Sequence, residues 1–166
     1  LTLLLMDKLI ANSPGRIVNV ASGAHMFIKE MNFDDLQSEK EYKTMRVYGQ
    51  SKLANILFTR ELSEKLEGKG ITVNCLHPGF VNTGIGSNNS PTLGRILMAM
   101  ARPFSRKTDK GAETSIYLCV SPEVEGISGE YYIDCEVSKI SGAARSKDNA
   151  EKLWNISSEL TGIDLH

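Results

Sequence analysis

Hydrophobic and polar positions follow two different spacings along this chain. Residues 16–21 and 71–76 are short β-branched runs, which predict two buried strands. Residues 129–134 (GEYYID) are predicted to form a third strand. Between residues 48 and 66, leucine and isoleucine recur every three to five positions with charged residues between them. That spacing predicts an amphipathic helix.

Further helical segments accompany the strands. Residues 1–10 are interpreted as the end of a buried helix, stopped by the breakers Ala11-Asn12-Ser13-Pro14-Gly15. Apolar periodicity also predicts helices within 92–110, over 111–120 and over 146–160.

Alternating strands and helices are typical of βαβ units, so we predict an α/β fold with a parallel sheet of about three strands.

Length and composition narrow the class of protein. The 166 residues suffice for one domain, and a formal net charge of −1 gives no electrostatic case for binding nucleic acid. Apolar runs are all shorter than the roughly 18 residues that cross a bilayer. Three widely spaced cysteines predict reduced thiols in an intracellular protein and no metal site. Because the chain opens on Leu1 inside an apolar stretch, we expect it to be a piece of a longer protein.

The segment with the clearest chemistry is Tyr48-Gly49-Gln50-Ser51-Lys52. Residues four apart share one face of a helix, so the phenol of Tyr48 and the ammonium of Lys52 would be neighbours. A free phenol is too weak an acid to exchange protons readily at neutral pH, and a nearby cation stabilises its ionised form. Taken alone, however, this spacing is equally consistent with an exposed polar start of a helix.

The surroundings of this pair favour a functional interpretation. Ser22 directly follows the first predicted strand, and Pro78-Gly79-Phe80-Val81-Asn82-Thr83 follows the second. Open parallel sheets bind ligands in the crevice at the carboxyl ends of their strands. We therefore expect a serine hydroxyl and a rigid turn at the edge where such a ligand would bind.

A serine after a strand, then YxxxK, then PGxVxT after the next strand resembles the short-chain dehydrogenase/reductase family. The segments SKLANILFTREL and HPG, with a long insertion before Tyr48, resemble its retinol dehydrogenase branch. The resemblance covers the whole chain and implies one partial domain, 1–166, the catalytic and substrate-binding C-terminal half of a Rossmann-type doubly wound sheet. The N-terminal dinucleotide-binding half, with its glycine-rich turn and catalytic asparagine, would precede Leu1.

The resemblance also implies a role for each matching residue. Tyr48 would be the general acid/base that protonates a carbonyl oxygen, and Lys52 would stabilise its ionised form and bind the nicotinamide ribose. Ser22 would donate a hydrogen bond to the substrate oxygen. The remaining residues, implied to line the nicotinamide pocket, are Pro78, Gly79, Val81 and Thr83. No metal is implied.

The family implies an NAD(P)-dependent oxidoreductase that interconverts an alcohol and a carbonyl, with retinol/retinal or another hydrophobic aldehyde or ketone as substrate. NADP is the expected cofactor and NAD remains an alternative. A homodimer and a peripheral membrane contact, at the endoplasmic reticulum or mitochondrion, stay open. The rival interpretation is a truncated, catalytically incompetent chain that acts only as an interaction or dimerisation module.

Several other features have weaker functional interpretations. The basic amphipathic stretch 92–107 could cover the substrate, touch a membrane or pack as an ordinary helix. His25 could line the substrate cleft, whereas His77 beside Pro78 is more simply structural. Gly84-Ile85-Gly86 lacks the third glycine of a dinucleotide fingerprint and is better interpreted as a hinge.

Overall fold

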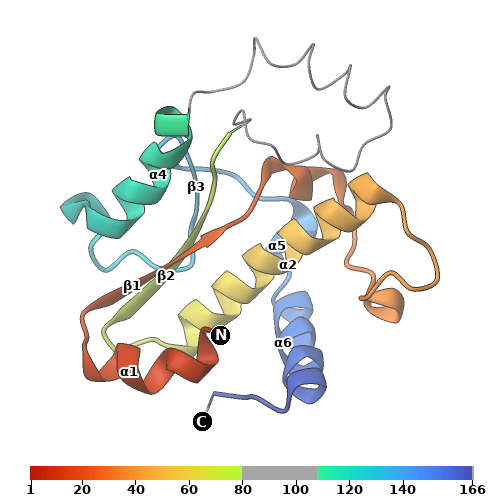
Figure 1. The fold of residues 1–166 in the computed structure, drawn as a ribbon, viewed down its shortest axis with the longest axis horizontal. Coiled ribbons are helices and arrows are strands. Elements are labelled where there is room, and N and C mark those ends of the chain that lie inside the picture. The colour runs from red at the N-terminus through yellow and green to blue at the C-terminus, as the bar shows by residue number, and fades with distance from the viewer. Residues whose placement is uncertain (80–107, 166) are drawn as a thin grey trace.

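The computed structural model describes residues 1–79 and 108–165 (Figure 1). Its elements, in chain order, are η1 (Leu3–Leu5), α1 (Met6–Ala11), β1 (Gly15–Val20), η2 (Gly23–Phe27), η3 (Phe33–Asp35), α2 (Thr44–Lys65), β2 (Ile71–His77), α4 (Thr108–Val120), η5 (Pro122–Val124), β3 (Tyr131–Ile133), β4 (Glu136–Val137), α5 (Gly142–Arg145) and α6 (Lys147–Thr161).

The described strands form one sheet in the order β1-β2-β3-β4. The first three are parallel, with Val20 opposite Leu76 and Cys75 opposite Tyr131, which confirms the predicted parallel α/β architecture. The fourth, β4, pairs antiparallel with β3 and was not predicted. Its turn places Asp134 and Cys135 at φ values of 54° and 65°, without the Asn-Gly pair that usually marks such hairpins.

Helices cover both faces of this sheet, as Figure 1 shows for α2 and α4. Successive residues of a strand point to opposite faces. Cys75 and Tyr131 accordingly pack in a core cluster with Leu53, Ile56 and Leu57 of α2. Their neighbours in sequence pack on the other side against α4, in a cluster of Leu76, Leu118, Val124 and Tyr132. The doubly wound arrangement therefore follows from two opposed apolar faces.

The start of the chain differs from its prediction as a buried helix. Residues 3–11 form a short 3-10 turn and the six-residue helix α1. Met6 is the only buried residue among the first ten. Leu4 and Leu5 are 68% and 47% exposed. Because the leucines of η1 are consecutive, no single face of this turn can bury them all.

Other segments lie close to their predicted positions. The helix predicted from residue 48 begins four residues earlier at Thr44, where no apolar periodicity announces it. α6 begins after Ser146, whose hydroxyl accepts a hydrogen bond from the Asn149 backbone N–H. The predicted amphipathic stretch 92–107 and Gly84-Ile85-Gly86 lie outside the described residues. Within 1–79 and 108–165, no helix has the length and apolarity needed to cross a membrane.

Candidate active site

The candidate site lies where β1 and β2 end. Ser22 follows β1, and Pro78 and Gly79 follow β2. The two strands are parallel and are paired up to Val20, the last residue of β1, so these segments leave the sheet at the same edge. The two segments are in contact, because a Cβ on Gly23 would lie 3.5 Å from Nε2 of His77. Val81 and Thr83, predicted for the same pocket, lie outside the described residues.

Ser22 has a tightly held local structure. It is only 8% exposed, and its backbone is extended before the chain turns into η2. Its Oγ accepts a hydrogen bond from the Ala24 backbone N–H at 3.2 Å. Its carbonyl oxygen lies 2.7 Å from Nδ1 of His25. The serine hydroxyl is therefore presented by a short capped turn rather than by a free loop.

Tyr48 and Lys52 lie on the first half of α2, as the four-residue spacing predicts. The Lys52 Nζ lies 5.6 Å from the centroid of the Tyr48 ring, and the tyrosine is 41% exposed. The same ammonium donates to the carbonyl oxygen of Val20 at 3.3 Å. Lys52 therefore connects the tyrosine to the end of β1, two residues before Ser22.

Asn55 is a residue that the sequence analysis missed. Its Nδ2 donates to the same Val20 carbonyl oxygen at 3.1 Å. It lies three residues after Lys52, on the same helix face, which is the only sequence signal that could have indicated it. Two side chains of α2 thus converge on one carbonyl at the end of β1.

Gly49 allows the serine-bearing turn to approach the tyrosine-bearing helix. It is buried, and a Cβ at this position would lie 2.8 Å from Ile28 side-chain atoms and 3.1 Å from the carbonyl oxygen of Ala24. Both distances are shorter than ordinary van der Waals contact. The absence of a side chain next to Tyr48 therefore sets how closely η2 packs on α2.

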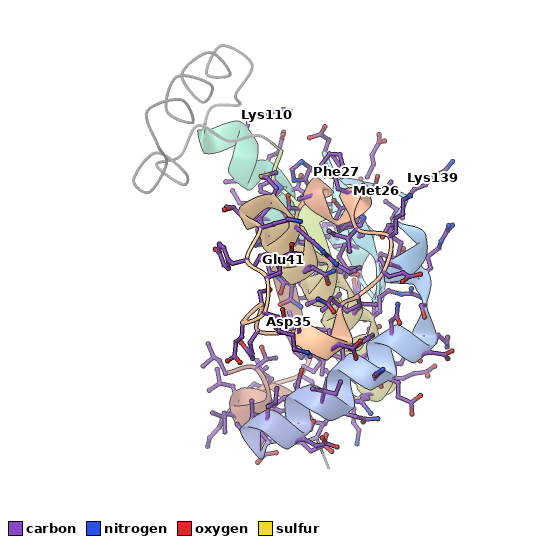
Figure 2. All side chains as sticks on the ribbon, turned by 90° about the vertical axis from the view of Figure 1, so that its right-hand side faces the viewer. Met26, Phe27, Asp35, Glu41, Lys110 and Lys139 are labelled. Carbon is purple, nitrogen blue, oxygen red and sulfur yellow. The ribbon has the colours of Figure 1, made fainter. Side chains whose placement is uncertain are left out.

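The insertion before Tyr48 forms an ordered structure beside the site. The Asp35 carboxylate accepts hydrogen bonds from the backbone N–H groups of Glu39, Lys40 and Glu41. Gln50 of α2 donates to the Glu30 carbonyl. Figure 2 shows Asp35 and Glu41 on one side of the molecule, with Met26 and Phe27 of η2 above them. A hydrogen bond from Lys43 and its charge lower the pKa of Glu41.

Two buried groups near this edge have shifted protonation equilibria. Burial lowers the pKa of His25, and its hydrogen bond to the Ser22 carbonyl opposes that effect less strongly. Burial raises the pKa of the Cys75 thiol to about 12, consistent with a residue of the apolar core. Among residues 1–79 and 108–165, no group of three or more His, Cys, Asp or Glu side chains is placed to bind a metal.

Comparison with known sequences identifies the family. The sequence profile of the family described as short chain dehydrogenase matches residues 1–94, which is more than half of the chain. This chain belongs to the short chain dehydrogenase family. The match includes Ser22, Tyr48, Lys52, Pro78 and Gly79, the residues brought together at the sheet edge.

Individual relatives confirm the predicted resemblance to retinol dehydrogenases. The chain is 44% identical over 163 residues to Retinol dehydrogenase 12 of Mus musculus, with 98% of this chain and 51% of the relative covered. It is 46% identical over 165 residues to Retinol dehydrogenase 14 of Homo sapiens, with 98% and 49% covered. The chain therefore spans about half the length of the curated relatives it matches.

Solved structures support the fold of this chain. An uncharacterized protein from Mycobacterium paratuberculosis matches with a TM-score of 0.70 and 24% identity, covering 99% of this chain and 56% of the other. An NAD(P) dependent gluconate 5-dehydrogenase from Beutenbergia cavernae, with bound NADP, matches with a TM-score of 0.57 and 21% identity, covering 80% and 49%. At these identities the likeness concerns the fold alone.

Proposed function

We propose that this chain is the catalytic and substrate-binding part of an NAD(P)-dependent oxidoreductase that interconverts a hydrophobic alcohol and the corresponding carbonyl compound. The observation that carries the proposal is the arrangement of Tyr48, Lys52 and Ser22 at one edge of the sheet. The Tyr48 ring lies 5.6 Å from the Lys52 ammonium. The same ammonium bonds to the end of the strand that leads into Ser22.

Each of these residues has a distinct task in the proposed reduction. Tyr48 donates its phenolic proton to the carbonyl oxygen, and the adjacent cation of Lys52 stabilises the tyrosinate that forms. Ser22 donates a hydrogen bond to the same oxygen as negative charge develops there. In the alcohol-oxidising direction, the tyrosinate accepts the hydroxyl proton.

The residues present fit a nicotinamide nucleotide on its nicotinamide side. One hydrogen of the Lys52 ammonium is used by the Val20 carbonyl, which leaves two donors for ribose hydroxyls. Pro78 and Gly79, the latter at a φ of 80°, would lie along the nicotinamide ring, together with Val81 and Thr83. When bound, the nucleotide supplies or accepts the hydride. We propose that the adenosine and pyrophosphate are held by residues outside these 166.

NADP and a retinoid-like substrate are the finer parts of the proposal. The relatives at 44% and 46% identity are named retinol dehydrogenases, and a solved structure of the same fold holds NADP. Met26 and Phe27, on the turn directly after Ser22, are 55% and 80% exposed and labelled in Figure 2. Exposed apolar side chains on the turn that follows Ser22 suit a hydrophobic substrate such as retinal. An intracellular location, with a peripheral membrane contact and a homodimer, completes the proposal.

Replacing Tyr48 by phenylalanine tests the central role. In a protein of the relatives' full length that carries this chain, Tyr48→Phe removes one oxygen atom and should lower turnover by about 10²- to 10⁴-fold. NADPH affinity, measured by titration calorimetry, should stay near its original value. Tyr42→Phe is the matched control, because Tyr42 is 70% exposed and only six residues away.

The outcomes separate the two interpretations of the chain. Near-normal turnover in the Tyr48→Phe protein would remove Tyr48 from its role as acid/base. A full-length protein with no turnover before any substitution would favour the rival, in which the chain serves only as an interaction or dimerisation module. The rival is tested because this chain covers only 51% of the length of its relative Retinol dehydrogenase 12.

A further inference from the structure

His25 lies three residues after Ser22 and makes a short contact back to it. Its Nδ1 is 2.7 Å from the Ser22 carbonyl oxygen. Because a carbonyl oxygen can only accept a hydrogen bond, Nδ1 carries the hydrogen and donates it. The ring is fully buried, and its Nε2 has no hydrogen-bond partner among the residues that the structure describes.

The surroundings of the ring keep it uncharged. The Tyr131 ring lies edge-on with a centroid separation of 5.0 Å, and burial lowers the pKa of His25. A neutral ring has one donor and one acceptor, and here the donor is used by Ser22. Since the ring is closed off from solvent, it does not line an open substrate cleft, which was one interpretation of the sequence. The contacts of the His25 ring are with Ser22 and Tyr131 inside the protein.

The contact restricts the peptide that joins Ser22 to Gly23. The Ser22 carbonyl receives the His25 ring hydrogen and also the His25 backbone N–H at 3.3 Å. The Ser22 Oγ receives the Ala24 N–H, which occupies one of its lone pairs. The hydroxyl hydrogen remains available to a substrate oxygen. On the preceding side, Val20 is held by Lys52 and Asn55, so the serine is fixed at both flanks.

We propose that His25 is a positioning residue: by donating from Nδ1 to the Ser22 carbonyl, it aims the Ser22 hydroxyl at the substrate oxygen. The inference rests on the proposed function and adds to it a residue that touches neither substrate nor cofactor. Catalytic groups must be held within a fraction of an ångström, and a misplacement of about 1 Å can cost about 10²-fold in rate.

Two amide variants of His25 distinguish an effect of the hydrogen-bond donor at the Nδ1 position from an effect of side-chain packing. In His25→Asn, the side-chain amide can reach the place of Nδ1, whereas in His25→Gln it reaches the place of Nε2. Both variants bury an uncharged amide of similar polarity. In the full-length protein, we expect His25→Asn to retain most of kcat and His25→Gln to lose about 10- to 100-fold, with KM for NADPH unchanged.

A Ser22→Ala background tests whether the effect passes through the serine. If His25 acts by aiming that hydroxyl, His25→Gln should have little further effect on kcat once Ser22 is alanine. An equal loss in both backgrounds, or equal kcat for the Asn and Gln variants, would overturn the inference. If Ser22→Ala and Tyr48→Phe both leave turnover intact, the proposed function fails instead, which is a different result.

A measurement on the unaltered protein decides the matter if the variants do not fold. Nitrogen-15 chemical shifts of the His25 ring report which nitrogen carries the hydrogen. We expect the Nδ1-protonated tautomer between about pH 6 and 8, since this nitrogen faces the carbonyl. The Nε2-protonated tautomer would contradict the donation to Ser22 and overturn the proposal.

Discussion

The two halves of helix α2 differ sharply in their surroundings. In the site half, residues 44–55, Met45 and Tyr48 are 69% and 41% exposed, and polar side chains reach to the end of β1. In the core half, residues 56–65, Ile56, Leu57 and Leu62 are fully buried. A single continuous helix therefore carries the candidate acid/base Tyr48 in its first half. Many of the buried side chains that pack the helix against the rest of the protein lie in its second half.

This division explains how Tyr48, which is exposed, and Lys52, which is partly buried, can be held accurately. Short helices are marginal by themselves, and most of their stability in proteins comes from packing of an apolar face. The core half supplies most of that packing, together with Leu53, so the other side chains of the site half are free to present polar groups. The two are linked to β1 by one chain of bonds, in which Asn19 donates to Thr59 and Thr59 donates to the Asn55 carbonyl.

The largest effect on stability should come from the core half. Leu62 is fully buried in a cluster with Met6, Val73 and Trp154. Leu62→Ala should lower the free energy of unfolding by about 2–5 kcal/mol, measured by urea denaturation. Met45→Ala, on the exposed side of the site half, should change it by less than about 0.5 kcal/mol. Comparable losses for the two variants would contradict the division.

A smaller effect should appear at the junction of the halves. Asn55→Ala removes one of two donors to the Val20 carbonyl and should cost about 1 kcal/mol of unfolding free energy. Asn155→Ala in α6 is the matched control, because it replaces the same residue type in an exposed helix position and shares the gain in helix propensity. If the difference between the two variants vanishes, Asn55 does not anchor α2 to β1.

Local patterns of the sequence predicted most of this arrangement. The period of Leu53 to Leu66 predicted α2, and the four-residue spacing placed Tyr48 and Lys52 on one face. The strands predicted at 16–21 and 71–76 appear at Gly15–Val20 and Ile71–His77. These features depend on neighbours within a few residues, which is why the sequence alone reveals them.

Contacts between distant segments could not be predicted in this way. Asn55 meets Val20 across 35 positions, and only the packing of α2 on β1 brings them together. The burial of His25 depends on Tyr131, which is more than a hundred residues away. The hairpin that forms β4 was missed because Asp134 and Cys135 adopt left-handed backbone without a glycine. The predicted roles of Val81 and Thr83 remain predictions.

The smallest expected effect concerns pH, and it belongs to η2, the turn that packs against the site half of α2. Burial lowers the pKa of His25 below its ordinary value of 6.5, so the unfolded chain binds this proton at a higher pH than the folded one. The stability that His25 contributes is therefore complete above about pH 6.5 and is lost as the pH falls toward the folded pKa. The slope from one group cannot exceed about 1.4 kcal/mol per pH unit. Urea midpoints at pH 7.5 and 5.5 should thus differ more for the native protein than for His25→Asn.

Cys75 of β2, which packs against the core half of α2, provides the control for this pH dependence. Cys75 packs against Ile56 and Leu57, and burial raises the pKa of its thiol to about 12. The thiol is therefore protonated in both the folded and the unfolded state across this acid range, and Cys75→Ala should lower the midpoints at pH 7.5 and 5.5 by the same amount. If the His25→Asn protein keeps the full acid dependence of the native protein, the proton is bound elsewhere. The acid response would then not distinguish the surroundings of the site half from those of the core half.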